Sequence, residues 1–348
     1  MAQTDDVHSL DVGPLAEWMA AHVPGFDGGA VEASKFAGGQ SNPTYRITTP
    51  GGEFVLRRKP PGDLLPGAHA VEREFRVMAA LAPAGIPVPR VYDLCEDESV
   101  VGTPFFLMDL VEGRIFWDPT LPDVPRDERC ACYDDMNRVI AALHQVDYEA
   151  VGLGDYGKPG NFFARQIHRW SRQYREDEAA GRIPAMDRLC EWLPDNIPEG
   201  DETTIVHGDY RCDNLVFHPT EPRVIAVLDW ELSTLGHPLA DFTYHLMKYY
   251  TPSGLPAGMA GADTAALGLP SADEYVAAYC RRTGRDGIEH LDFYLAFNLW
   301  RLAAIIHGVK GRMLRGNASS DHARQLVSRL DALADAAWTQ AEKAGAGS

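Results

Sequence analysis

The chain has 348 residues, 45% of them hydrophobic, and its 32 basic and 50 acidic side chains give a formal net charge of −18. This length can bury a large core divided between two domains or lobes. The negative charge disfavours nucleic acid and anionic membranes as partners. No uncharged apolar run approaches the roughly 18 residues of a membrane span.

The start of the chain lacks a basic region followed by an apolar run, so we expect no secretory signal. The six cysteines do not have the spacing of a zinc site and are interpreted as reduced thiols. Together these features predict a cytoplasmic protein. They do not indicate its oligomeric state.

The N-terminal third predicts a sheet with one main helix. A proline in a first turn indicates a short helix over 14–22, and the helical spacing of apolar residues indicates a second over 68–82. Apolar and β-branched runs bounded by Gly and Pro predict strands over 31–36, 44–48, 53–58, a run after 88–91, and 104–110. The last run is nearly all apolar, so we expect it in the interior of the sheet.

Glu74 lies within the apolar face of the predicted helix 68–82, a face that also contains Val71, Phe75, Met78 and Leu81. An unpaired buried carboxylate costs several kcal/mol. Glu74 therefore either pairs with a cation from the third strand, Arg57 or Lys59, or reaches water at the rim of the helix. The residues alone leave both interpretations open.

A glycine loop joins the first two predicted strands and contains Gly38, Gly39, Gln40 and Ser41. Backbone N–H groups in such a loop can approach phosphates because no Cβ atoms obstruct them. An ordinary turn explains the same residues, so this segment alone is a weak indication.

Helices replace strands after residue 112, which predicts a lobe of residues 1–111 and a second lobe of residues 112–348. His144, on the first of these helices, is interpreted as a packed core residue. The residues between 251 and 269 are rich in Gly, Pro and Ala and predict a loop. The predicted helices cover 126–146, 162–179, 185–192, 238–249, 271–283, 288–314 and 320–343.

The stretch 203–230 carries the chemistry. Two short apolar runs end in Asp209 and Asp229, Asn214 follows five positions after Asp209, and Arg211 lies between them. Two carboxylates, a carboxamide and an arginine at strand ends can bind a hard divalent cation and a phosphate.

The order of these elements resembles the aminoglycoside phosphotransferase and choline kinase branch of the protein-kinase-like fold. The most specific part is VHGDYRCDNLVF, followed by Asp229 fifteen residues after Asn214. The segments FVLRRKPPG, VEREFRVMAAL, VPRVYDL, MDLVEGR and LDWELSTLGHPLAD are most similar to kinase-like domains related to those fused to acyl-CoA dehydrogenases. The resemblance implies an α+β, bilobal fold with a five-stranded antiparallel sheet and a larger helical lobe.

The resemblance also implies ATP and Mg²⁺ as cofactors and assigns a role to each residue of the central stretch. Asp209 would orient the acceptor hydroxyl and take its proton, and Arg211 would lie near the transferred phosphate. Asn214 and Asp229 would hold Mg²⁺.

In the N-terminal lobe, the resemblance places Arg57 on the α- and β-phosphates and Glu74 beside it. The remaining implied nucleotide contacts come from the glycine loop, the back of the adenine pocket and the backbone next to adenine: Gly38, Gly39, Gln40, Ser41, Met108, Asp109 and Val111.

The chain departs from the pattern of protein kinases at several positions. Arg57 replaces a lysine, with Lys59 as a possible substitute. Gly208 stands in place of the arginine before the catalytic aspartate, so control by activation-loop phosphorylation is not expected. Trp230 follows the metal-binding Asp229 where protein kinases have phenylalanine. Asp241 is interpreted either as holding the backbone of the catalytic loop or as an ordinary residue at a helix start.

These features predict a kinase that phosphorylates a hydroxyl of a small molecule. A nucleotide-binding module without turnover and a metal-dependent phosphohydrolase are the alternatives. The segments 161–175 and 298–312 are expected to define the acceptor. Four positive groups on the second segment would suit a hydroxyacyl-CoA or another carboxylate-bearing alcohol better than an aminoglycoside, unless they only solvate a helix end: Arg301, His307, Lys310 and Arg312.

Overall fold

The computed structural model describes residues 10–36, 42–62, 69–255, 258–316 and 321–347. Its N-terminal part is a five-stranded antiparallel sheet with the strand order β1-β2-β3-β5-β4. The strands are β1 (Glu32–Lys35), β2 (Thr44–Thr49), β3 (Gly52–Arg58), β4 (Val91–Cys95) and β5 (Phe105–Asp109). The predicted sheet and the interior position of the strand over 104–110 are confirmed.

The two faces of the sheet differ because side chains alternate along each strand. On β5, Phe105 and Leu107 join the apolar cluster around helix α1 (Val12–His22). Phe106 and Met108 point to the other face, toward helix α2 (Val71–Leu81). Because Arg57 is paired with Phe106 across the ladder, its side chain also emerges on the α2 face.

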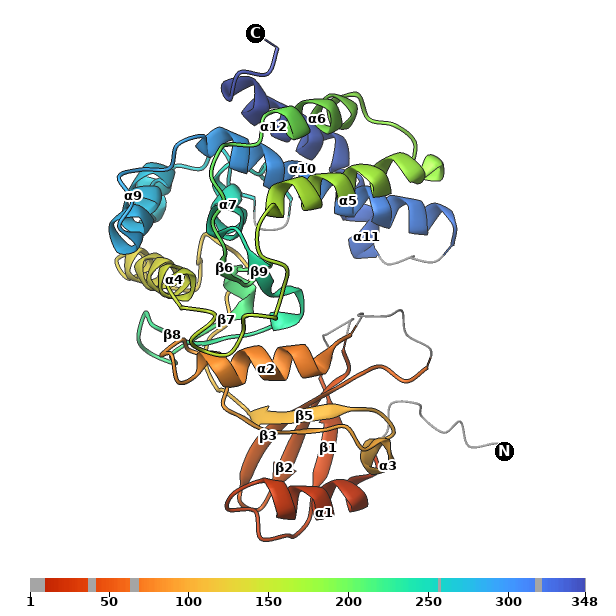
Figure 1. Ribbon diagram of the computed structural model, residues 1–348. Helices are drawn as coiled ribbons and strands as arrows, with labels where there is room; N and C mark the ends of the chain where they lie inside the picture. Colours follow the sequence, from red (N-terminus) through yellow and green to blue (C-terminus); the bar gives the residue numbers. More distant parts are fainter. Residues whose placement is uncertain (1–9, 37–41, 63–68, 256–257, 317–320, 348) are drawn as a thin grey trace.

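Helix α2 lies between the sheet and the helical part of the molecule (Figure 1). Its buried apolar residues belong to the same continuous core as the C-terminal helices, whereas the α1 side of the sheet has a separate core. Val77 is fully buried on this helix, while Phe75 is only partly buried, so the apolar face is rotated slightly from the predicted one.

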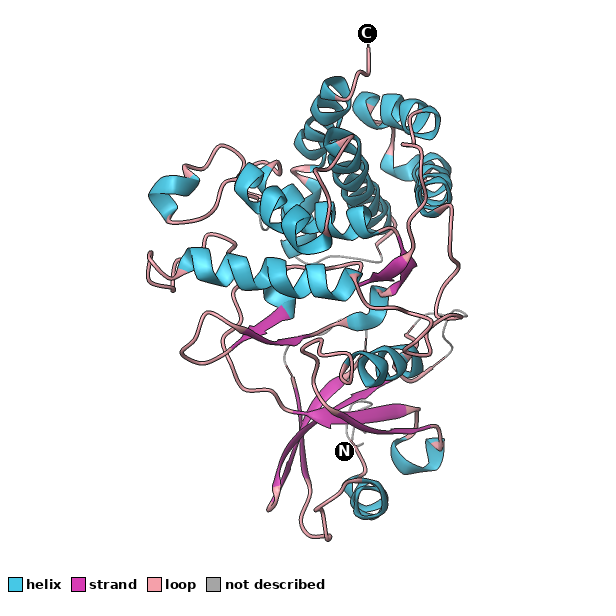
Figure 2. Cartoon of the chain, turned by 60° about the vertical axis from the view of Figure 1, so that its left-hand side comes forward, coloured by secondary structure: helices cyan, strands magenta, loops and turns pink. Residues whose placement is uncertain are grey.

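Helices dominate from residue 129 onward, and Figure 2 shows them stacked on one side of the sheet. The long helix α10 packs against α5, α7 and α12 and forms the centre of this part. The helices are α4 (Arg129–His144), α5 (Phe162–Glu176), α6 (Pro184–Asp195), α7 (Pro238–Leu246), α8 (Thr264–Leu267), α9 (Ala272–Thr283), α10 (Leu291–Leu314), α11 (Asp321–Val327) and α12 (Leu330–Lys343).

Three local predictions are corrected. The predicted helix 320–343 is two helices, α11 and α12, separated at Ser328–Arg329. The predicted loop 251–269 contains the short helix α8, which begins with the Asp263 carboxylate accepting a hydrogen bond from the N–H of Ala266. Another short helix, α3 (Glu98–Val101), was not predicted and is capped in the same way by Asp97.

Two small two-stranded sheets lie between the five-stranded sheet and the helices. Strand β6 (Thr204–Val206) pairs with β9 (Thr234–Gly236), and β7 (Leu215–Phe217) pairs with β8 (Val224–Val227). The segment after β5 reaches them through a bridge between Arg114 and Phe217. Within the described ranges, no helix has both the length and the apolar character needed to cross a membrane.

Candidate active site

The loop after β6 is held by the side chain of Asp241 on α7. The Asp241 carboxylate accepts hydrogen bonds from the backbone N–H groups of His207 and Gly208, each 2.8 Å long. Gly208 has a φ of +84°, and a Cβ at this position would lie 2.7 Å from the carbonyl oxygen of Leu232. Glycine is therefore required before Asp209, since the turn has a positive φ and a close backbone neighbour.

Asp241 is buried and also contacts His144, whose Nε2 lies 3.2 Å from its Oδ2. Burial acts to raise the pKa of Asp241, but the hydrogen bonds from His144 and the loop N–H groups outweigh it and lower that pKa. Helix α7 is capped by His237, which accepts from the N–H of Leu239. Of the two interpretations of Asp241, the structure confirms the one in which it holds the loop.

Asp209 follows this turn, and each of its carboxylate oxygens has a different neighbour. Oδ1 accepts a 2.6 Å hydrogen bond from the hydroxyl of Tyr244 and lies 3.3 Å from Nε of Arg211. Oδ2 lies 3.2 Å from Nδ2 of Asn214. The Asp209 side chain is 21% exposed, so a ligand can reach it. The guanidinium of Arg211 lies between Asp209 and Asp213.

The β7–β8 hairpin brings Asn214 next to Asp229. Leu215 is paired with Val227, and the N–H of Leu228 donates to the carbonyl oxygen of Asn214 over 2.8 Å. Asn214 immediately precedes β7 and Asp229 closely follows β8, so both side chains emerge at the same end of the hairpin. Carboxylate and carboxamide oxygens are hard ligands, and this pair fits Mg²⁺ with its other ligands from phosphate and water.

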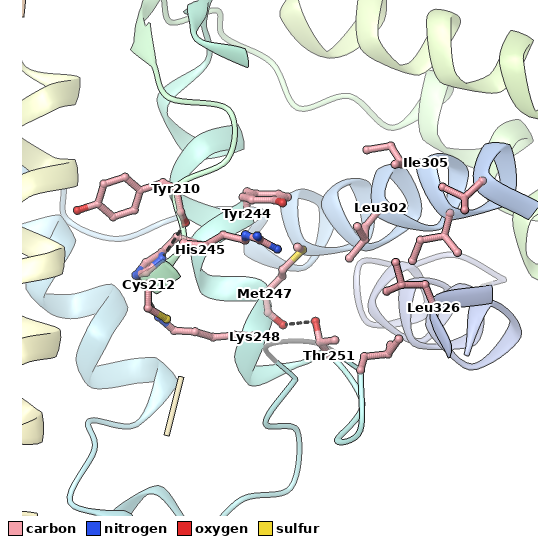
Figure 3. Close-up of a pocket in the computed structure, with 14 residues that line it drawn as sticks. Tyr210, Cys212, Tyr244, His245, Met247, Lys248, Thr251, Leu302, Ile305 and Leu326 are labelled. Atoms are coloured by element: carbon pink, nitrogen blue, oxygen red, sulfur yellow. Dashed lines mark hydrogen bonds between the residues drawn. The ribbon is translucent and has the colours of Figure 1, made fainter. Parts of the chain in front are cut away.

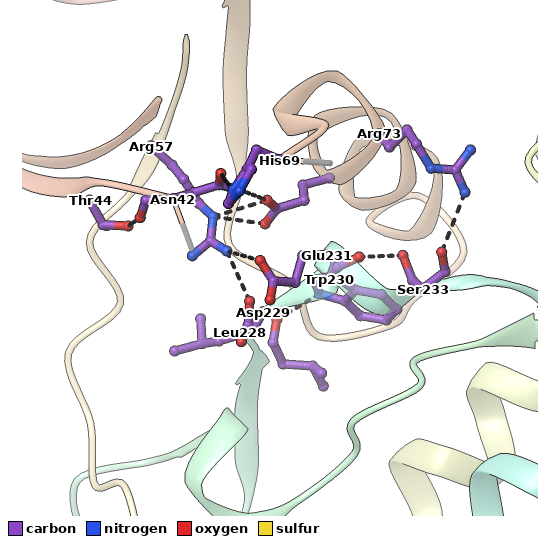
Figure 4. Close-up of polar contacts among 12 residues, drawn as sticks. Asn42, Thr44, Arg57, His69, Arg73, Leu228, Asp229, Trp230, Glu231 and Ser233 are labelled. Carbon is purple, nitrogen blue, oxygen red and sulfur yellow. Dashed lines mark hydrogen bonds and ion pairs between the residues drawn. The ribbon is translucent and has the colours of Figure 1, made fainter. Parts of the chain in front are cut away.

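Arg57 links the sheet to this hairpin (Figure 4). Its Nε lies 2.9 Å from Oε2 of Glu74, and its Nη2 lies 2.9 Å from Oδ1 of Asp229 and 3.5 Å from Oε2 of Glu231. The predicted ion pair between Glu74 and a cation of the third strand is confirmed, with Arg57 as the cation. Lys59 instead contacts Glu72 at 2.9 Å on the half-exposed side of α2.

Glu74 is 2% exposed, and this burial raises its pKa to about 7, although Arg57 and Asn42 act in the opposite direction. Nδ2 of Asn42 donates to Oε1 of Glu74 over 2.8 Å, and Oδ1 of Asn42 lies 3.1 Å from Nδ1 of His69. Asn42 directly follows the glycine loop, so this network begins where that loop ends. The glycine-loop residues lie outside the described residues: Gly38, Gly39, Gln40 and Ser41.

The residues predicted to contact adenine lie at the end of β5 and just after it. Met108 is partly buried on the same face of the sheet as Val55, its partner across the ladder. The N–H of Asp109 donates to the carbonyl oxygen of Arg90 over 2.9 Å. This bond engages the Asp109 N–H, so an adenine contact at this residue is expected through its carbonyl oxygen. Val111 lies two residues further on, in extended chain.

Trp230 anchors the segment after Asp229. Its side chain is 1% exposed, its Nε1 donates to the carbonyl oxygen of Val227 over 2.9 Å, and its ring centroid lies 4.7 Å from that of His207. Arg73 of α2 reaches the carbonyl oxygen of Ser233 over 3.4 Å. The segment after Asp229 is therefore packed between the loop that carries Asp209 and α2.

A cavity of about 190 Å³ opens beside the two neighbours of Asp209, Tyr244 and Arg211 (Figure 3). At one end lies Lys248, a buried amine whose pKa is lowered by burial to about 8. Its other walls are mostly aliphatic, from α10, α11 and the chain after α7: Met247, Leu255, Leu302, Ile305, Ile306, Val309 and Leu326.

The sequence left open whether the cations of 301–312 lie near an acceptor pocket or only solvate a helix end. Leu302, Ile305, Ile306 and Val309 recur at helical spacing and line the cavity, so the intervening cations point elsewhere. Arg301 donates to the carbonyl oxygen of Gly208 over 3.0 Å, and His307 is buried against the carbonyl oxygen of Gly181. Among the described residues, neither these cations nor the segment 161–175 contributes to the cavity wall.

Several residues that shape this site are not evident, or not with this role, from local sequence patterns. Glu231, two after Asp229, could have been noticed as a second carboxylate beside the metal ligand. His144 was interpreted as a core residue and is buried, but it also contacts Asp241. Tyr244 has no local pattern that distinguishes it. Arg301 is noticed in the sequence only as one positive group of the segment 298–312, and helix packing brings it to Gly208.

A profile of the phosphotransferase enzyme family matches residues 32–294. The chain belongs to this family. The match confirms the predicted family and, together with the solved structures below, the protein-kinase-like fold. It also supports a phosphotransferase that acts on a small molecule.

Individual members of the family are similar over nearly the whole chain. Acyl-CoA dehydrogenase family member 10 of Mus musculus is 49% identical over 319 residues, covering 91% of this chain and 30% of the mouse protein. The chain spans less than half the length of the curated relatives it matches.

Two solved structures show the same fold. A Ralstonia eutropha protein classed with the aminoglycoside phosphotransferases has 52% identity and a TM-score of 0.89, covering 96% of this chain and 99% of that protein. A thermostable mutant of aminoglycoside phosphotransferase APH(4)-Ia, crystallised with AMP-PNP and hygromycin B, has 16% identity and a TM-score of 0.59, covering 97% and 100%. At that identity, the second comparison concerns the fold alone.

Proposed function

We propose that this phosphotransferase is an ATP- and Mg²⁺-dependent kinase that transfers a phosphoryl group to a hydroxyl of a small molecule. The observation that carries the proposal is one connected set of contacts. Arg57 touches Asp229, Asn214 is joined to Asp229 by the β7–β8 hairpin, and Asn214 touches Asp209. A proposed phosphate-binding cation, two metal ligands and a base are thus connected through direct contacts and one hairpin.

Each group has a role in phosphoryl transfer. Asn214 and Asp229 would hold Mg²⁺, which when bound neutralises charge on the phosphates and aligns them. Arg57 would bind phosphate oxygens and Arg211 would stabilise charge on the transferred group. Asp209 would orient the acceptor hydroxyl and accept its proton late in the reaction.

The nucleotide would lie under the sheet on the α2 face. Met108 would border adenine, and the carbonyl oxygen of Asp109 and the N–H of Val111 would bond its edge. The loop of Gly38, Gly39, Gln40 and Ser41 would cover the phosphates. The AMP-PNP complex of the distant relative APH(4)-Ia supports an adenine nucleotide as the donor.

The cavity beside Asp209 is the proposed acceptor site. Its aliphatic walls suit an acyl or alkyl group, and the charged residues that line it, Arg211 and Lys248, are both cationic. A polycationic aminoglycoside would meet like charge and lose its hydration against apolar walls. A hydroxyacyl-CoA or another carboxylate-bearing alcohol therefore fits this cavity better than an aminoglycoside. We also propose that the protein acts in the cytoplasm.

The test is to incubate the protein with Mg²⁺ and ATP and to screen hydroxylated metabolites for ADP release, with aminoglycosides in the same panel. We expect release with acyl or carboxylate-bearing alcohols and none with aminoglycosides. Binding of ATP without transfer to any acceptor would favour the nucleotide-binding module. Hydrolysis of phosphate esters without ATP would favour the phosphohydrolase.

A further inference from the structure

Tyr244 is a buried tyrosine whose hydroxyl points at the proposed base. It lies on α7, three residues after Asp241, and is 9% exposed. Its hydroxyl donates to Oδ1 of Asp209 over 2.6 Å, a short bond of the kind formed with charged acceptors. Burial and the charge of Asp209 both raise the pKa of Tyr244, so the phenol remains protonated and remains a donor.

Arg301 supports this tyrosine from α10. Its guanidinium carbon lies 5.3 Å from the centre of the Tyr244 ring, and its Nη2 donates to the carbonyl oxygen of Gly208 over 3.0 Å. One arginine therefore contacts both the ring that bonds Asp209 and the backbone that precedes Asp209. Such a stacked and hydrogen-bonded arrangement fixes the relative positions of the two.

Because of these contacts, the two carboxylate oxygens of Asp209 have different environments. Oδ1 accepts the 2.6 Å hydrogen bond from Tyr244 and lies 3.3 Å from Nε of Arg211. Within the described residues, Oδ2 has one contact, a 3.2 Å hydrogen bond from Nδ2 of Asn214. Oδ2 is therefore the oxygen that can accept the proton of an incoming hydroxyl. Without the Tyr244 bond, the carboxylate could rotate and present either oxygen.

We infer that Tyr244, held by Arg301, is a positioning residue that fixes the Asp209 carboxylate so that Oδ2 faces the acceptor. This inference rests on the proposed function, because it requires Asp209 to act as the base. It also explains why Tyr244 belongs to the cavity wall: its ring borders the acceptor site while its hydroxyl sets the direction of the base.

The test compares Tyr244→Phe with the wild-type protein, using the best acceptor found in the metabolite panel. The variant keeps the ring and loses the donor, so we expect kcat to fall roughly tenfold to a hundredfold, as for a lost hydrogen bond to a charged group. The KM values for ATP and acceptor, and the Kd for AMP-PNP with Mg²⁺, should stay within about twofold, since ground-state binding is unchanged.

Tyr174→Phe is the matched control. The Tyr174 hydroxyl also donates to a carboxylate, that of Asp187, over 2.8 Å, but it lies between α5 and α6 and does not contact the catalytic loop. This variant should lose comparable thermal stability and keep its kcat. An equal fall of kcat in both variants, or an unchanged kcat in Tyr244→Phe, would overturn the inference.

A second pair of variants tests the same arrangement if Tyr244→Phe does not fold. Arg301→Met removes the contacts with the Tyr244 ring and with the carbonyl oxygen of Gly208, and it should lower kcat. Arg301→Lys keeps a positive charge near the ring, so its kcat should lie between those of Arg301→Met and the wild type. Equal kcat values for these two variants contradict the inference. If the wild-type protein phosphorylates none of the acceptors in the panel, the proposed function and this inference fail together. The inactive wild type distinguishes that case from a failure of the inference alone.

Discussion

Asp241 and Glu74 are two buried carboxylates, 3% and 2% exposed, that stand on opposite sides of the candidate active site. Asp241 accepts two backbone N–H groups of the catalytic loop and a contact from His144, and its pKa is lowered. Glu74 accepts the side chains of Arg57 and Asn42, and its pKa is raised to about 7.

The difference comes from the partners. Backbone N–H groups within a turn cannot move away, so the charge of Asp241 is stabilised permanently and the loop that carries Asp209 is rigid. The Arg57 guanidinium is shared between Glu74 and Asp229, and it sits on a side chain with rotatable bonds. The loop that carries Asp209 is thus held by backbone N–H groups in fixed positions. On the proposed nucleotide side, the carboxylates are held by the Arg57 guanidinium, which can exchange partners.

If the rigid loop serves to aim Asp209, then removing its carboxylate should have the largest effect. We expect Asp209→Ala to lower kcat by roughly 10²–10⁴-fold, the usual contribution of a positioned base. Nucleotide affinity, measured by titration with AMP-PNP and Mg²⁺, should change by about threefold or less. Near-normal turnover in this variant would show that the base is assigned to the wrong residue.

Asp241→Asn tests whether the hydrogen bonds from the fixed N–H groups stabilise the fold as well as the loop. The amide of asparagine would lose the negative charge that accepts the N–H groups of His207 and Gly208. We expect the free energy of unfolding to fall by about 3 kcal/mol or more, as when one member of a buried charged network is removed, and kcat to fall with it. Urea denaturation measures the first effect.

Asp147→Asn is the control for this prediction. The Asp147 carboxylate also accepts two backbone N–H groups, those of Glu149 and Ala150, each over 3.0 Å, but in an exposed turn. We expect Asp147→Asn to lower the free energy of unfolding by less than about 1 kcal/mol, because water can replace the lost hydrogen bonds. Equal losses for the two variants would mean that burial of Asp241 contributes little.

Arg57→Met tests the mobile cation on the nucleotide side. Without the guanidinium, the phosphates lose a charged contact, and we expect the KM for ATP to rise roughly tenfold to a hundredfold. Lys59→Met should leave this KM within about threefold, since Lys59 contacts Glu72 away from Asp229. The opposite outcome would make Lys59 the phosphate-binding residue. Initial rates at several ATP concentrations decide between them.

The smallest expected effect concerns pH. Because the folded protein raises the pKa of Glu74 from 4.5 to about 7, Glu74 contributes stability that is present below pH 4.5 and lost as the pH rises through about 7. Glu74→Gln removes this dependence. As the pH rises from 4.5 to 8, the wild type should therefore lose unfolding free energy relative to the Glu74→Gln variant. Glu72→Gln, on the same helix but 42% exposed, is the comparison variant.

Residues that belong to local patterns could be predicted from the sequence. Asp209 and Asp229 each end a short apolar run, and Glu74 interrupts an apolar helical face that has a cation on the neighbouring strand. The five strands followed from the same kind of pattern, because each is bounded by Gly or Pro. The position of β5 between β3 and β4 was foreseen only as an interior strand, since pairing depends on the whole sheet.

Residues that reach the site through tertiary packing could not be predicted in this way. Tyr244 is 35 residues from Asp209, and Arg301 is 93 residues from Gly208, so no short spacing relates them. The cations between 301 and 312 illustrate a different limit of sequence patterns. They were grouped because they are close in sequence, whereas the helical period sends them and the aliphatic cavity residues in different directions.

The packing of Trp230 also has a consequence for inhibitor discovery. One way for a compound to block this site would be to displace the segment after Asp229 and occupy the space that it leaves. Here that segment is anchored by an indole buried against His207 and by the close approach of Leu232 to Gly208. Screening against this protein should therefore yield compounds that compete directly with the nucleotide or fill the aliphatic cavity, and few that depend on an outward swing of this segment.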